Sequence, residues 1–104
     1  MKEATTAPEF LRQGASHMED RASTYDSPEG ERSTGKAVKA FNAVTGRELT
    51  EAEGWLFLQL LKDVRQWANP EFHRDSAEDC VAYAALKAEA LASTGPKQLS
   101  LFFT

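Results

Sequence analysis

The sequence predicts an all-α protein with four helices and a short peptide tail. Apolar side chains recur at three- and four-residue steps, capping patterns stand where helices would begin, and no segment sustains the alternation of a β-strand. We expect a compact, bundle-like helical domain over residues 1–94 and a tail over residues 95–104. A length of 104 residues suits one domain with a modest core.

The first helix is expected to begin after Thr6, because a capping residue followed by Pro8 and an acid is typical of a helix start. Gly14 weakens this helix, and turn-forming residues at positions 26–30 end it. Its inward face is predicted from the three- and four-residue spacing of Leu11, Ala15, Met18, Ala22 and Tyr25.

A shorter second helix is predicted from about Thr34 to Thr45. Gly46 follows it as the expected C-terminal stop, because glycine readily adopts the left-handed conformation that ends helices. The side chains expected to face inward are Val38, Phe41 and either Val44 or Thr45.

The third helix has the clearest signals at both ends. Thr50 and Glu53 have the spacing of a capping box, and Asn69-Pro70 ends the helix. Large apolar side chains surround it almost completely: Trp55, Leu56, Phe57, Leu58, Leu60, Leu61, Val64 and Trp67. Such a helix belongs either in the centre of a bundle or in an oligomer interface, so a homo-oligomer is one expectation.

Asp75 and Glu78 are expected to form a second capping box, opening a fourth helix that runs to about Ser93. Its core side is predicted to contain Cys80, Tyr83, Ala84, Leu86 and Leu91. Because a short loop joins helices three and four, they should be antiparallel neighbours. Lys62 and Arg65 would then reach Asp75 or Asp79. These residues form either inter-helix salt bridges or a site for phosphate groups.

Composition argues against several functions. A net charge of −4 disfavours non-specific duplex DNA binding, which needs a basic face. The single cysteine, Cys80, excludes an internal disulfide, fits a reducing compartment and is expected to be a core thiol rather than a nucleophile. No apolar stretch approaches the ~20 residues of a membrane helix and no signal peptide is recognisable, so we expect a cytoplasmic protein without a membrane partner. His17 and His73 lack neighbouring ligands, so neither a metal site nor a catalytic residue is assigned.

Parts of the helical domain resemble a small uncharacterised family encoded mostly by phages and prophages. The resemblance rests on residues 20–28, on Lys62 and Arg65, and on residues 74–79 and 83–86. The layout of this family is loosely similar to the all-α nucleoside triphosphate pyrophosphohydrolases of the MazG type, which bind magnesium through acidic residues on two facing helices. A phage origin implies the cytoplasm of a bacterial host.

The MazG-like resemblance implies an alternative function, in which the helical domain binds, sequesters or hydrolyses a nucleotide. Mg²⁺ would be the cofactor in that case alone. The chain departs from the MazG pattern, because Glu51 and Glu53 have no third acid on the following turn. A non-enzymatic role is therefore favoured over a magnesium-dependent pyrophosphohydrolase. The candidate nucleotide-binding residues are Arg21, Tyr25, Lys62, Arg65, Asp75 and Asp79.

The tail after Gly95-Pro96 contains a peptide that resembles the motif with which bacterial proteins bind the β sliding clamp of the replisome. That motif has Gln, Leu, Ser or Asp, Leu and Phe in order, usually at a terminus, and all five positions match Gln98, Leu99, Ser100, Leu101 and Phe102. So apolar a tail either docks on a partner or folds back over its own core, and the match favours docking. The expected function is clamp binding by a phage-type protein, which either inhibits replication or joins the replisome.

Overall fold

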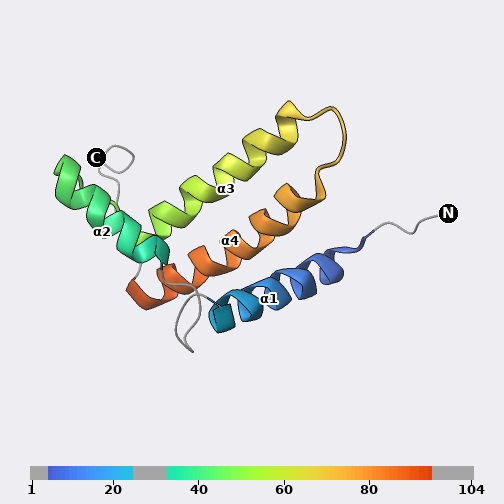
Figure 1. The fold of residues 1–104 in the computed structure, drawn as a ribbon, viewed down its shortest axis with the longest axis horizontal. Coiled ribbons are helices and arrows are strands. Elements are labelled where there is room, and N and C mark those ends of the chain that lie inside the picture. Colours follow the sequence, from blue (N-terminus) through green and yellow to red (C-terminus); the bar gives the residue numbers. More distant parts are fainter. Residues whose placement is uncertain (1–4, 25–32, 95–104) are drawn as a thin grey trace.

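The computed structural model describes residues 5–24 and 33–94, which form four helices (Figure 1). They are α1 (Ala7–Thr24), α2 (Ser33–Thr45), α3 (Glu51–Ala68) and α4 (Arg74–Thr94). The all-α prediction is confirmed, since these residues contain no strand. Tyr25 and the clamp-like peptide at 98–102 lie outside the described residues.

Helices α3 and α4 form a central antiparallel hairpin, with α1 beside α4 and α2 at the N-terminal end of α3 (Figure 1). Helix α1 packs on α4, and α2 packs on α3. Within the described ranges, α1 and α2 do not pack against each other. The predicted antiparallel pairing of helices three and four is therefore confirmed. No described helix combines the length and apolar composition needed to cross a bilayer.

The core lies between α3 and α4 and is centred on Trp55, which is 2% exposed. The indole ring lies against Tyr83, with ring centroids 5.6 Å apart, and its Nε1 donates to Glu51 Oε2 at 3.3 Å. The other buried members of this cluster are Ala52, Leu86 and Ala90. Two of these three are alanines, so the helices approach closely and bury little apolar surface.

Helix α3 begins as the sequence predicts. The Thr50 backbone N–H donates to Glu53 Oε1 at 2.7 Å, and the Glu53 backbone N–H donates to Thr50 Oγ1 at 3.1 Å. Each side chain thus satisfies a backbone donor of the other residue, so the predicted capping box is confirmed. The helix ends at Ala68 with Asn69 as its C-cap.

The predicted capping box of α4 is wrong. This helix begins at Arg74, one residue before the predicted cap Asp75, and His73 precedes it. The Ser76 backbone N–H donates to His73 Nδ1 at 3.3 Å, so the imidazole takes the role assigned to a carboxylate. The Asp-x-x-Glu spacing is misleading here because the His73 ring, one position before the helix, accepts the hydrogen bond that a capping carboxylate would otherwise accept. The C-terminal end at Thr94 is within one residue of the prediction.

The predicted inward face of α1 is only partly correct. Leu11 is 63% exposed and Ala15 is exposed, whereas Met18 packs against the core. Gly14 is buried and lies beside Val81 on α4. The face of α1 that meets α4 therefore contains Gly14. The spacing of apolar side chains cannot predict this position, because glycine has no side chain.

In α2, Val38 is buried as predicted, but Phe41, Val44 and Thr45 are exposed. The helix packs on α3 alone, so only the side facing α3 is covered. Its end is as predicted: Gly46 has φ +73° and its N–H donates to the Asn42 carbonyl at 2.9 Å. The Asn42 side chain also exchanges two 2.9 Å hydrogen bonds with the Leu49 backbone, which fixes the loop between α2 and α3 to the end of α2.

Candidate functional site

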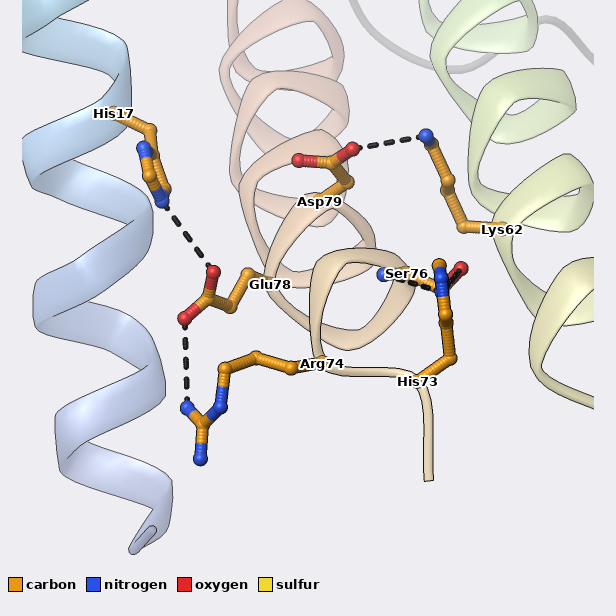
Figure 2. Close-up of polar contacts among 7 residues, drawn as sticks. All are labelled: His17, Lys62, His73, Arg74, Ser76, Glu78 and Asp79. Atoms are coloured by element: carbon orange, nitrogen blue, oxygen red, sulfur yellow. Dashed lines mark hydrogen bonds and ion pairs between the residues drawn. The ribbon is translucent and has the colours of Figure 1, made fainter. Parts of the chain in front are cut away.

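Of the predicted polar residues, Lys62 and Asp79 meet directly. Lys62 Nζ on α3 lies 2.9 Å from Asp79 Oδ2 on α4 (Figure 2). Their side chains are 14% and 30% exposed, so water screens this ion pair less than a fully exposed one. The pair neutralises both charges and joins the two helices of the central hairpin.

The other predicted nucleotide-binding residues are not brought into this pair. Arg65 and Asp75 are exposed and form no ion pair with the residues that the structure describes. Arg21 lies in α1, where its backbone alone is described, and Tyr25 is outside the described ranges. Of the four residues predicted to form inter-helix salt bridges, Lys62 and Asp79 thus form one, and Arg65 and Asp75 do not take part in it.

Glu78 serves the opposite side of α4. Its carboxylate receives His17 Nε2 from α1 and Arg74 Nη1 from the first turn of α4, each at 3.5 Å (Figure 2). The Glu78 side chain is 13% exposed. Sequence reasoning missed this contact because it treated Glu78 as a capping residue. The four-residue spacing of Arg74 and Glu78 was a usable signal.

Arg74 also holds the start of α1. Its guanidinium carbon lies 5.7 Å from the ring centroid of Phe10 on α1 and 5.7 Å from that of Phe72 in the α3–α4 loop. The two rings meet edge to face, 6.2 Å apart. Arg74 Nη2 donates to Thr5 Oγ1 as well. These contacts make Arg74 an anchor between α1 and the loop.

Ser76 and His73 form a close polar pair at the start of α4 (Figure 2). Ser76 Oγ lies 2.6 Å from His73 Nδ1, and the Ser76 backbone N–H donates to the same nitrogen. Because a backbone N–H can only donate, Nδ1 accepts and the ring proton is assigned to Nε2. Ser76 is 1% exposed, so its hydroxyl cannot attack a substrate. The pair is a helix cap rather than a nucleophile and its base.

Cys80 has the environment of an unreactive thiol. It is partly buried, and its Sγ donates to Asp63 Oδ1 at 3.5 Å. Burial raises the pKa of the Cys80 thiol above its ordinary value, and the charge and hydrogen bond of Asp63 raise it further. A thiol held in its protonated form is a weak nucleophile, in keeping with the predicted structural role.

A cavity of about 70 Å³ lies where the helices meet and is bordered by Asp79. Its other polar and aromatic lining residues include His17, Thr34, Trp55 and Tyr83. Ligand pockets commonly measure ~300–1,000 Å³, so this cavity admits water molecules and not a nucleotide. Across residues 5–24 and 33–94, no group of three or more His, Cys, Asp or Glu side chains is arranged to hold a metal ion.

The geometry therefore gives a set of inter-helix contacts on both sides of α4, and its chemistry is that of charge neutralisation and capping. The clamp-like peptide is a separate candidate site, which follows α4 in sequence. No protein-family model, curated protein or solved structure matches this chain.

Proposed function

We propose that this chain binds the bacterial β sliding clamp through residues 98–102. The observation that supports the proposal is the five-position match of Gln98-Leu99-Ser100-Leu101-Phe102 to the clamp-binding peptide. Such a match fits an interaction protein, in which a few anchor side chains provide most of the binding energy.

The chemistry of the peptide suits this role. Leu101 and Phe102 are adjacent, so an extended chain points them apart and a turn is needed to place both in one pocket. Gln98 has two donors and an acceptor, with which it can fix the register against a partner backbone. The preceding Lys97 adds a positive charge that suits an acidic rim.

The helical domain provides a firm point of attachment. Helix α4 ends at Thr94, four residues before Gln98, and is packed against α3 through Leu86 and Ala90. A short linker to a rigid body keeps the peptide close to the helical domain. Binding of the clamp therefore places this domain at the replisome, where it either excludes host polymerases or acts as a tethered module.

Titration calorimetry with purified clamp tests the proposal. A short peptide that orders on binding commonly has a micromolar dissociation constant, about −8 kcal/mol. The Leu101→Ala/Phe102→Ala variant should lose binding, because both anchors are removed. Phe103→Ala is the matched control, since it removes an aromatic ring just outside the motif and should bind as the parent does. Equal binding by the double variant would make the motif a coincidence.

Competition and tethering are separated by primer extension with a clamp-dependent polymerase. If the chain competes for the clamp, extension slows as its concentration rises, and the double variant has no effect. If the chain is a tethered module, it binds the clamp without slowing extension. A chain that slows extension equally with and without the two anchors acts elsewhere than the clamp.

The nucleotide-binding alternative stays a prediction. The ion pair between Lys62 and Asp79 favours a structural role for these residues, because each already has a partner of opposite charge. The cavity beside Asp79 is also far smaller than a nucleotide requires. A larger open groove of about 460 Å³ beside Lys62 has a mainly apolar lining that includes Trp67, Phe72 and Val81. We therefore do not propose it as a second function.

A further inference from the structure

One side of α3 has a large apolar surface that no described part of the chain covers. We call it the α3 outer face, and it consists of Leu56, Phe57, Leu60, Leu61, Val64 and Trp67. Trp67 is 86% exposed, Phe57 71% and Val64 65%. The face lies opposite to Ala52 and Trp55, which are buried against α4.

The spacing within this face is that of a helix-packing seam. Phe57, Leu60, Val64 and Trp67 follow one another at steps of three, four and three residues. On an α-helix these positions fall within about 80° of arc, the width that one facing helix covers. The two remaining members, Leu56 and Leu61, flank the seam.

The α3 outer face contains no charge. Two ionisable residues on this stretch of α3 point toward α4 and not into the α3 outer face. Lys62 pairs with Asp79 on α4, and Asp63 accepts a hydrogen bond from Cys80, which is also on α4. Arg65 follows Val64 directly and is therefore turned by about 100° away from it around the helix. Two copies of an uncharged seam can therefore meet about a two-fold axis without like-charge repulsion.

The area of the face also suits a second copy. The six exposed fractions correspond to roughly 700 Å² of apolar surface, near the ~800 Å² that each partner buries in a standard interface. Monomers rarely expose contiguous apolar patches above a few hundred Å². The described part of the chain buries only six apolar residues, three of them alanines. Among the described residues, more large apolar side chains are therefore exposed than buried.

We infer that the chain forms a homodimer in which the α3 outer faces of two copies pack against each other about a two-fold axis. Residues 5–24 and 33–94 leave this face uncovered, and a second copy brings a seam of matching length, apolar character and area to it. The inference rests on described residues and is independent of clamp binding. If both hold, each particle presents two clamp-binding peptides.

Light scattering after size exclusion, over a range of protein concentrations, tests the inference. The expected result is a dimeric mass for the parent chain. Val64→Glu places a charge in the seam and should weaken association by more than about tenfold. Val44→Glu is the matched control, because it makes the same change at an 86%-exposed valine on α2 and should leave the dimer intact.

Two further measurements keep the result decisive. Trp67→Glu is a second seam variant at a side chain that contacts little within one copy, so its monomer should retain the helical circular dichroism of the parent. In the parent, Trp67 fluorescence should shift to the red on dilution, as the interface opens to water.

A parent that is monomeric at every concentration overturns the inference. A Val64→Glu variant that stays dimeric overturns it too, because another surface then holds the copies. If deleting residues 98–104 turns a monomer into a dimer, the tail of the same chain is the occupant, and the inference is wrong.

Discussion

At the scale of single residues, Glu78 and Asp79 are neighbours in sequence and serve opposite sides of α4. Successive positions on an α-helix are turned by about 100°, so Glu78 meets His17 on α1 while Asp79 meets Lys62 on α3. One dipeptide thereby connects the central helix to both of its neighbours. Neither carboxylate is left to bind a ligand in this arrangement.

The Asp79→Asn variant should lower stability and change no ligand response. The substitution leaves the Lys62 ammonium without its counter-charge in a place that is 14% exposed, which we expect to cost about 1–2 kcal/mol. On the usual scaling the melting temperature falls by several degrees. Thermal shifts with a panel of nucleotides and magnesium measure both effects. Asp75→Asn is the control at an exposed carboxylate without an ion pair, and it should cost at most the ~0.3–1 kcal/mol that an acid in the first turn of a helix contributes. A nucleotide-dependent shift that Asp79→Asn abolishes would revive the nucleotide site.

The Asp63→Asn variant should make Cys80 react faster with iodoacetamide at neutral pH. Burial raises the pKa of the Cys80 thiol most, but the charge and hydrogen bond of Asp63 add to it, and their loss frees more thiolate. The control is Asp75→Asn, which is expected to leave the rate unchanged. Equal rates for both variants would show that burial alone protects the thiol.

The same raised pKa has a consequence for stability. The folded state holds the thiol proton more tightly than the unfolded state does, so the contribution of Cys80 is complete below the ordinary thiol pKa. As the pH rises past that value, the unfolded chain loses its proton first, and stability falls. A Cys80→Ser variant should show a smaller loss over the same alkaline range.

At the scale of helices, two glycines have opposite surroundings. A Cβ added at Gly14 on α1 would lie 3.6 Å from Val81 Cγ1, an ordinary contact distance. A Cβ added at Gly54 on α3 would lie 2.7 Å from Val38 Cγ2 and 3.2 Å from Thr34 Cγ2. Gly54 therefore permits the approach of α2, whereas Gly14 has room for a methyl group.

Gly14→Ala should stabilise the protein and Gly54→Ala should destabilise it. Alanine in a helix interior is favoured over glycine by about 0.5–1 kcal/mol, and at Gly14 nothing offsets this gain. At Gly54 the new methyl group must displace Val38, which is buried and stiff, at a cost of about 1–3 kcal/mol. Urea denaturation of both variants at one protein concentration measures the two signs. A destabilised Gly14→Ala would mean that the α1–α4 contact is tighter than its distances indicate.

At the scale of the whole molecule, the sequence predicts helices far better than it predicts how they face one another. Local chemistry set the start of α3 at Thr50 and the end of α2 at Gly46, and both are confirmed. The His73 cap was missed because an imidazole can accept in place of a carboxylate only in the right geometry. The exposure of Phe41 was missed because periodicity tells which side chains share a face, and not whether a partner covers that face.

The candidate site divides in the same way. The pairing of Lys62 with Asp79 followed from two antiparallel helices and a short loop, so it was within reach of sequence reasoning. The contact between His17 and Glu78 depends on how α1 lies across α4, which no local pattern fixes. The clamp-like peptide at 98–102 rests on its side chains alone and needs no tertiary structure to be recognised.

Deleting residues 98–104 should leave the free energy of unfolding within about 0.5 kcal/mol of the parent value. The core around Trp55 is formed by residues of α3 and α4. If the tail is free to bind a partner, as proposed, its removal takes no contact from this core. Chemical denaturation of the truncated and full-length chains provides the measurement. If Leu101 and Phe102 instead cover the helical domain, the loss is about 1.5–3 kcal/mol for each side chain. Such a loss would favour a tail that covers the helical domain over a tail that binds the clamp.

The placement of α1 and α2 on different helices of the central hairpin has a consequence for how the molecule opens. Because α1 rests on α4 and α2 rests on α3 without packing on each other, either outer helix can detach while the other stays in place. Amide hydrogen exchange should then be slowest around Trp55 and faster, at two unrelated rates, in α1 and α2. Val38→Ala should speed exchange in α2 alone. The central hairpin thus acts as one cooperative unit that carries two separately releasable arms.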